Sequence, residues 1–356
     1  MEGIKEMALL KGQEQRNIGS DVVRIVLTLM VMAAHFFVYT DMKMAAFSFT
    51  IPFFFVTSGF LIAKTFDRTW SGDRKHKIIL FYVKRFFRII PVFVVVMFVA
   101  DQFTGITYFY EKLFFVSNFY YFQDIHTREA FLSMFSLFNA HGDHMWYMSV
   151  LEQFYLVSPL LLLFAGRFRV AGLLFMIALA IGCRIYALGQ EEYRLYGMIL
   201  PINMEYFLWG ALAYTLSDQY PVIVMWCRRY ILFSLLGFLG VLTGQITGFG
   251  FTAYHVEVTH WQTPMAITLA LIFVGMNFTL KQGTLRKLIL FLSAITLSSF
   301  LVHPFVQAFF IFQWQMPGLT GFALSTFATC AIAILLFYSV EKPAHQLGRY
   351  VCQRIS

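Results

Sequence analysis

Ten runs of mainly apolar residues, each about 17 to 25 residues long, recur along this 356-residue chain. A run of that length suits one helical crossing of a bilayer whose hydrocarbon core is about 30 Å thick. The sequence therefore predicts an all-α polytopic membrane protein with about ten transmembrane helices. The expected spans are residues 22–40, 47–64, 83–101, 146–165, 170–189, 197–216, 230–247, 262–280, 288–311 and 319–340.

The composition supports this class. Hydrophobic residues make up 59% of the chain and charged residues 13%, which excludes a soluble domain with a polar surface. The net charge of +8 is spread in short clusters between the apolar runs, so membrane topology explains it better than nucleic-acid binding. The four cysteines stand far apart without paired histidines, and we expect neither a metal site nor a disulfide framework.

Basic residues gather in alternate connecting segments, for example within 64–88, 228–229 and 281–287, and the segments between them are neutral or acidic. By the positive-inside rule, this alternation predicts that both termini are cytoplasmic. We expect a cytoplasmic lead over residues 1–19, a transmembrane domain over 20–341 and a cytoplasmic tail over 342–356. The long, aromatic-rich outer segment 102–145 is expected to form an interfacial or re-entrant cap.

The first span contains two ionisable residues that are energetically unfavourable in a membrane, Arg24 and His35. They are eleven positions apart, so on a helix they lie on one face with a rise of about 16 Å between them. An ionisable residue near the middle of a membrane helix usually points into the protein and marks a functional site. The alternative from helical phase alone is a neutral histidine that is hydrogen-bonded to a neighbouring helix.

Arg85 and Arg88 begin the third span, three residues apart and therefore on one helical face. Together with Arg24 they can line a cytoplasmic mouth, where guanidinium groups suit phosphates bidentately. The alternative is that these basic residues merely follow the topology and touch lipid phosphates.

Acidic residues also occur inside the predicted spans. Glu152 lies at a depth close to that of His35, where a carboxylate would orient and stabilise a catalytic imidazole. The competing interpretation is a structural pair with an interior arginine such as Arg184. Glu205 is expected to be a partner of Arg184 rather than a catalytic group.

Three further residues are candidates for acceptor binding on the outer side. His303 falls toward the outer leaflet, and Pro304 after it would loosen the helix; a structural hydrogen bond is an equally good interpretation of this histidine. His144 abuts Trp146 and is therefore a better candidate than His141.

Six segments spread in one order over nearly the whole chain form a recognisable set: Asp21–Arg24 with His35, FFFVTSGFLI (53–62), FYVKRFFRIIP (81–91), WYMSVLEQFYLVSP (146–159), ITLSSFLVHP (295–304) and SVEKP (339–343). This set resembles the acyltransferase-3 family of integral membrane O-acyltransferases. One departure concerns the fourth segment, in which the family commonly has two acidic residues and this chain has Leu151 followed by Glu152.

The resemblance implies that an acyl group moves from cytoplasmic acyl-CoA, acetyl-CoA for example, to a hydroxyl of a carbohydrate or glycolipid acceptor. It implies that Arg24 and His35 are the essential pair, that Arg85 and Arg88 belong to the second motif, and that the setting is a bacterial inner membrane. The acyl group, the acceptor, the choice between direct transfer and an acyl-histidine intermediate, and the oligomeric state stay open. The rival hypotheses are a transporter that uses the buried Arg, His and Glu as a substrate or proton path, and a sensor that has lost catalysis.

Overall fold

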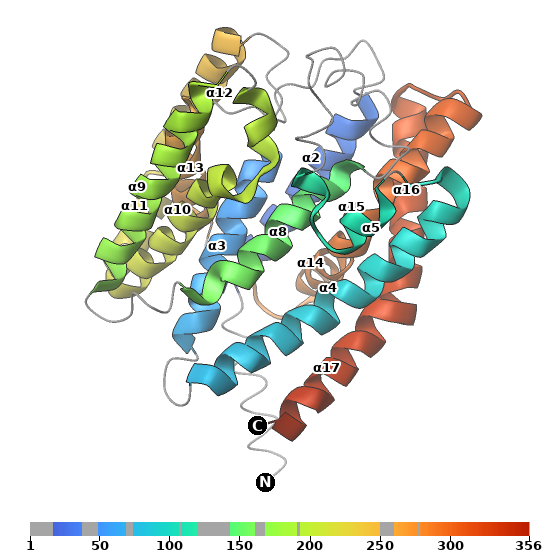
Figure 1. Ribbon diagram of the computed structural model, residues 1–356, viewed down its shortest axis with the longest axis horizontal. Helices are drawn as coiled ribbons and strands as arrows, with labels where there is room; N and C mark the ends of the chain where they lie inside the picture. The colour runs from blue at the N-terminus through green and yellow to red at the C-terminus, as the bar shows by residue number, and fades with distance from the viewer. Residues whose placement is uncertain are drawn as a thin grey trace.

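The computed structural model describes residues 17–37, 49–68, 74–106, 108–119, 143–160, 168–190, 193–249, 260–276 and 278–355, and this part of the chain contains helices and no strand (Figure 1). The elements are α2 (Ile18–Phe37), α3 (Thr50–Arg68), α4 (Arg74–Thr104), α5 (Phe109–Leu113), η2 (Asp143–Met145), α8 (Trp146–Val157), α9 (Arg169–Leu188), η5 (Tyr193–Met198), α10 (Leu200–Gln219), α11 (Pro221–Arg229), α12 (Ile231–Phe249), α13 (Gln262–Gly275), α14 (Thr284–Ala294), α15 (Thr296–Ala308), η7 (Phe309–Gln313), α16 (Leu319–Leu336), η8 (Phe337–Glu341) and α17 (Lys342–Ile355).

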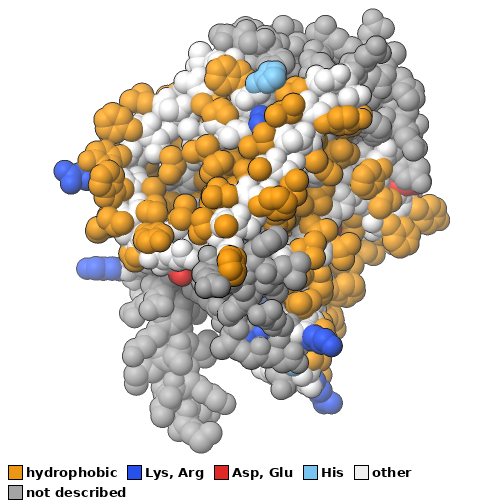
Figure 2. Space-filling view, turned by 60° about the vertical axis from the view of Figure 1, so that its left-hand side comes forward, with side chains coloured by type: hydrophobic (Ala, Val, Ile, Leu, Met, Phe, Trp, Pro, Cys, Tyr) orange, Lys and Arg blue, Asp and Glu red, His pale blue; other side chains and the backbone are white. Residues whose placement is uncertain are grey.

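Apolar helices long enough to cross a bilayer confirm the membrane class. Within the described residues, 4 helices meet the length and apolarity that a span needs, and a pair bent by 71°, α11 with the first part of α12, raises the number to 5. The side of the molecule that α9 and α12 form is covered by exposed apolar side chains (Figure 2), among them Phe175, Leu179, Phe233 and Leu236. A surface of this kind fits lipid, so the chain is an integral membrane protein.

Each of the ten expected spans overlaps a helix, but several helices differ from the expected ranges. The α4 helix begins at Arg74, nine residues before the expected start at 83. The expected span 288–311 is divided, because α14 ends at Ala294 and α15 begins at Thr296. The last helix continues past the expected end of its span at 340, since one helix of 37 residues runs from Leu319 to Ile355. The expected cap over 102–145 lies largely outside the described residues.

Glycines allow α3 and α10 to pack with their backbones in contact. A Cβ added at Gly59 would lie 1.9 Å from the carbonyl oxygen of Phe207, and one added at Gly210 would lie 2.0 Å from that of Val56. Small residues at helix contacts are typical of membrane bundles, because lipid tails and Leu side chains are equally apolar and tight packing must supply the attraction. This contact fixes α3, which forms one wall of the cavity described below.

A buried ion pair joins α9 to α10, as the sequence predicted. Arg184 Nε lies 3.3 Å from Glu205 Oε2, and both side chains are almost completely buried. Thr263 of α13 completes the group: its hydroxyl accepts a 2.7 Å hydrogen bond from Arg184 Nη2 and donates to Glu205 Oε1. The opposite charges and the hydrogen bonds of Thr263 to both partners offset the cost of burying the two charged groups.

Candidate active site

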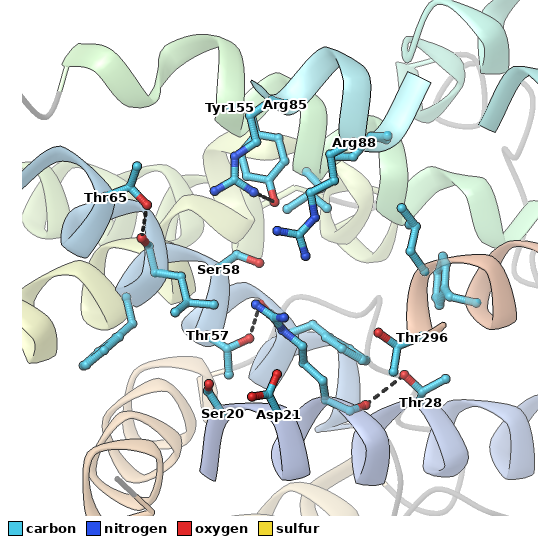
Figure 3. A pocket seen from close by; sticks show the side chains of 18 of the residues that line it. Ser20, Asp21, Thr28, Thr57, Ser58, Thr65, Arg85, Arg88, Tyr155 and Thr296 are labelled. Atoms are coloured by element: carbon cyan, nitrogen blue, oxygen red, sulfur yellow. Dashed lines mark hydrogen bonds between the residues drawn. The ribbon is translucent and has the colours of Figure 1, made fainter. Parts of the chain in front are cut away.

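A polar cavity of about 540 Å³ lies between α2, α3, α4, α8, α13 and α15. Its size is typical of pockets that bind small molecules. Side chains from all six helices line it, so the cavity exists only in the assembled bundle. Figure 3 shows Arg85 and Arg88 reaching into it from α4, opposite Ser20 and Asp21 of α2.

Four cationic side chains line the cavity: Arg24 of α2, Lys64 of α3, and Arg85 and Arg88 of α4. The structure thus brings together the three arginines that the sequence predicted for phosphate binding. Lys64 was missed as a site residue, because in the sequence it resembles any other basic residue at the end of a span. Among the described residues that line the cavity, Asp21 is the only acidic one, so the four cationic groups leave the cavity with a net positive charge.

Aromatic and acidic neighbours hold two of these groups in place. The Arg85 guanidinium stacks 4.6 Å from the centre of the Tyr155 ring, and its Nη1 lies 3.4 Å from the Tyr155 hydroxyl. Asp21 is buried and its Oδ1 accepts a 2.7 Å hydrogen bond from Ser293. Arg88 interacts electrostatically with Glu341 of η8, whose Oε1 accepts a hydrogen bond from Ser298. These contacts orient the walls while leaving the cavity a net positive charge.

Hydroxyl groups form much of the remaining polar lining. Thr28, Thr57 and Thr65 all line the cavity, and each donates a hydrogen bond of 2.8 or 2.9 Å to a backbone carbonyl three or four residues earlier in its own helix. A hydroxyl that donates backward in this way still presents its lone pairs to the cavity. Of the hydroxyl residues that line the cavity, Thr57 and Ser58 lie in the segment 53–62 and Thr296 lies in 295–304, although the sequence analysis did not single them out.

His35 and His303 form a hydrogen-bonded pair just beyond the inner end of the cavity. His35 Nδ1 lies 3.0 Å from His303 Nε2, and His303 Nδ1 lies 2.8 Å from the carbonyl oxygen of Phe300. A carbonyl only accepts, so His303 Nδ1 carries a proton and its Nε2, when the ring is neutral, is an acceptor. His35 Nδ1 must then donate, which leaves the lone pair of the neutral His35 ring on Nε2.

The sequence His303-Pro304 explains why this arrangement forms. Proline has no backbone N–H, so the residue four positions earlier, Phe300, loses its usual helical donor. The Nδ1–H of His303 takes that place on the Phe300 carbonyl. The helix also changes to a π-helix at Phe309, shortly after the proline. A local feature of the sequence therefore fixes the tautomer of His303.

His144 completes a cluster of three imidazole rings. Its ring centre lies 6.4 Å from that of His35 and 5.6 Å from that of His303. Its Nε2 lies 3.3 Å from the carbonyl oxygen of Leu301, and its buried Nδ1 has no hydrogen-bond partner within the described residues. His144, His303 and Trp146 are all buried, whereas His35 is partly exposed. His141 lies outside the described residues.

Phe300 stands between the cavity and the histidine cluster. It lines the cavity, together with Met148. Its ring centre lies 5.7 Å from that of His144 and 5.7 Å from that of His303. Thr28, the innermost α2 residue of the lining, precedes His35 by seven residues, a rise of about 10 Å. A ligand in the cavity must therefore extend past Phe300 to reach the histidines.

Leu151 and Glu152, where the family commonly has two acidic residues, point in different directions from α8. Leu151 lines the cavity, as do Met148 and Tyr155 on the same face of α8, and Glu152 does not. Adjacent helical positions differ by about 100°, so the carboxylate points away from that face. It interacts electrostatically with Arg85, and its Oε1 has no hydrogen-bond partner within the described part of the chain.

The fold and the site together define an integral membrane protein with a positively charged cavity near a cluster of three histidines. The comparison with family models gives one match, to the family Acyl_transf_3, described as an acyltransferase domain, over residues 17–338. The chain belongs to this acyltransferase-3 family, and the resemblance seen in the sequence is confirmed. No curated protein and no solved structure matches the chain.

The family covers both halves of the site. Arg24 and His35 of α2, and the cationic residues of α4, lie inside the matched region, and so do His303 and Phe300 of α15. Within the described residues, no group of three or more His, Cys, Asp or Glu side chains is arranged to hold a metal ion.

Proposed function

We propose that this chain transfers an acyl group, most simply acetyl, from cytoplasmic acyl-CoA to a hydroxyl of a cell-surface carbohydrate or glycolipid. His35 is the general base in this reaction. The observation that carries the proposal is the positive cavity ending beside the His35–His303 pair. It provides an anion site and a base at the two ends of one path.

The donor side of the proposal rests on charge. Coenzyme A carries several phosphate charges on a long, flexible molecule that ends in the thioester. Arg24, Arg85 and Arg88, with Lys64, offer charge-assisted hydrogen bonds to such phosphates. With the phosphates held there, the pantetheine arm extends along the hydroxyl-lined wall, and the thioester passes Phe300 to reach His35.

The chemistry follows from the tautomer of His35. The lone pair on Nε2 accepts the proton of the acceptor hydroxyl as its oxygen attacks the thioester carbonyl carbon. The new C–O bond forms, the C–S bond breaks, and the coenzyme A thiolate leaves and takes up the proton from the imidazolium. During the attack, the Nδ1–H bond to His303 becomes charge-assisted and stabilises the imidazolium. His303 is thus a positioning residue.

The acceptor side of the proposal involves His144 and Trp146. The ring of His144 lies near that of His35, and its Nδ1 has no hydrogen-bond partner within the described residues. A second hydroxyl of the carbohydrate is proposed to donate a hydrogen bond to this nitrogen. Trp146, two residues further along the chain than His144, packs edge to face with Phe55. His303, which the sequence suggested for acceptor binding, is proposed to act through His35. Glu152 is proposed to act through Arg85, because the structure brings its carboxylate near that group.

The topology proposal keeps about ten spans, with α14 and α15 together forming the ninth. Both termini lie in the cytoplasm, with residues 1–19 as a lead, 20–341 as the acyltransferase domain and 342–356 as a tail. The bilayer is a bacterial inner membrane. The support is the alternation of basic connecting segments along the sequence.

The test is the His35→Ala variant, reconstituted in lipid nanodiscs beside the matched variant His76→Ala, which removes a histidine of α4 outside the cavity lining. The transfer of radiolabel from [¹⁴C]acetyl-CoA to membrane-associated carbohydrate is measured. General-base help contributes about 10² to 10⁴-fold, so His35→Ala is expected to lose at least about 100-fold in turnover while keeping acetyl-CoA binding. Undiminished transfer by His35→Ala would refute the proposal.

A further inference from the structure

A second cationic groove lies between α4 and α17, on a face of α4 next to the one that lines the cavity. Its volume is about 490 Å³. Lys84 and Arg88 line it from α4, and Lys342, His345 and Arg349 line it from α17. The residues of the groove include no acidic side chain. The nearby Glu341 is buried and interacts electrostatically with Arg88, so it offsets part of the charge and leaves that of Lys84, Lys342 and Arg349.

The spacing of these residues places the cations of each helix on one face, and the two faces line the groove. Lys84 and Arg88 are four residues apart, and Lys342, His345 and Arg349 follow at intervals of three and four, so each set lies on one face of its helix. Like charges on facing helices repel, and such an arrangement is stabilised when an anion lies between them.

Close packing at one point brings the two faces together. Gly348 of α17 lies against Phe87 of α4, where an added Cβ would stand only 2.7 Å from the Phe87 Cβ. With glycine at that position, the helices approach closely enough for the cations on either side of the contact to line one groove. Figure 1 shows α4 and α17 side by side along this contact.

The helix length places the groove at the level of lipid headgroups. The continuous helix from Leu319 to Ile355 has 37 residues and is about 55 Å long, well beyond the hydrocarbon thickness of about 30 Å. The part that contains α16 and η8 crosses the apolar layer, and Lys342 comes at its end. Lys342 lies 5.1 Å from the centre of the exposed Tyr338 ring, a pairing typical of a membrane interface.

We propose that this groove binds the phosphate headgroup of an anionic phospholipid, whose acyl chains lie along the neighbouring apolar surface. Phe337 and Tyr338 line the groove on its membrane side, and Phe86 is exposed beside it. A soluble anion would contact the cationic side chains but not these apolar ones, whereas a phospholipid contacts both. Basic pockets between transmembrane helices commonly hold anionic headgroups. Arg88 lines both the groove and the main cavity, so a bound lipid contacts one of the residues proposed to hold the acyl donor.

The experiment titrates the purified full-length chain with palmitoyl-oleoyl phosphatidylglycerol or with the corresponding phosphatidylcholine, and native mass spectrometry counts the retained lipid. The test variant is Lys84→Gln/Lys342→Gln/Arg349→Gln, three exposed groove residues that do not line the main cavity. The matched control, Arg228→Gln/Arg229→Gln/Lys287→Gln, removes three exposed cations elsewhere.

The wild type and the control variant are expected to prefer phosphatidylglycerol by about 10- to 100-fold, and the groove variant is expected to lose that preference. The groove variant keeps its affinity for acetyl-CoA, so this result is independent of the main cavity. Equal binding of the two lipids by the wild type overturns the proposal, and so does an unchanged preference in the groove variant. Displacement of the lipid by equimolar inorganic phosphate or acetyl-CoA overturns it in favour of a soluble anion.

Discussion

Replacing His303 with leucine tests how the imidazole pair works. In the wild type, His303 Nε2 accepts a hydrogen bond of 3.0 Å from His35 Nδ1, and His303 Nδ1 donates a hydrogen bond of 2.8 Å to the Phe300 carbonyl. Leucine has a similar bulk but neither accepts nor donates. His303→Gln is the conservative variant, because its amide oxygen can accept from His35 at nearly the same position.

The expected effect follows from the charge that develops on His35. When this ring takes the proton of the acceptor hydroxyl, its bond to His303 becomes a hydrogen bond from a cation, which contributes about 1.5–3 kcal/mol. A tenfold rate corresponds to about 1.4 kcal/mol, so His303→Leu is expected to lower kcat by about 10- to 150-fold. The KM for acetyl-CoA is expected to stay unchanged, because His303 does not line the cavity.

The assay measures steady-state transfer from [¹⁴C]acetyl-CoA in nanodiscs, with the unfolding temperature of each variant as a control for folding. His303→Gln is expected to retain most of the activity that His303→Leu loses. The reasoning is refuted if both variants lose activity equally, because a merely structural role would produce that result. It is refuted as well if His303→Leu changes KM and leaves kcat intact.

Two further predictions concern the bundle that holds the site. Glu205→Gln is expected to lower the free energy of unfolding by about 3–5 kcal/mol, because it leaves Arg184 buried without its counter-charge. The double variant Arg184→Met/Glu205→Leu is expected to lose less stability, since it removes both charges. Equal losses of the two variants in denaturant-induced unfolding would contradict this reasoning. Gly210→Ala places a methyl group 2.0 Å from a carbonyl oxygen of α3 and is expected to cost about 1–3 kcal/mol, whereas Gly240→Ala, which has open space around it, should be nearly neutral in the same measurement.

Features within one helix could be predicted from the sequence. The common face of Arg24 and His35, and that of Arg85 and Arg88, depend only on the helical period, and the structure contains both helices. The partner of Arg184 could also be predicted, because a buried charge needs an opposite charge and few were available among the apolar runs.

Features that depend on contacts between helices far apart in the sequence could not be predicted. The bond between His35 and His303 joins positions 268 residues apart, and only the packing of α2 against α15 brings them together. Lys64 has no local feature that separates it from the other basic residues near span ends. The break at Ile295 was hidden, because residues 288–311 form one mainly apolar run of span length with no glycine or proline near 295.

The most direct test of the central claim is the binding of acetyl-CoA to the purified protein, measured by isothermal titration calorimetry at a stated ionic strength near 0.15 M, since salt screens phosphate contacts. The wild type is compared with Arg85→Ala/Arg88→Ala and with the matched variant Arg228→Ala/Arg229→Ala, whose two arginines are exposed and lie outside the cavity.

The account predicts that the wild type and the matched variant bind acetyl-CoA. Each lost charge-assisted contact is worth about 1.5–3 kcal/mol, so the Arg85/Arg88 variant should bind at least about 100-fold more weakly. A folded wild-type protein that does not bind acetyl-CoA would contradict the account and favour a transporter, for which Arg24, His35 and Glu152 would form a path for substrate or protons.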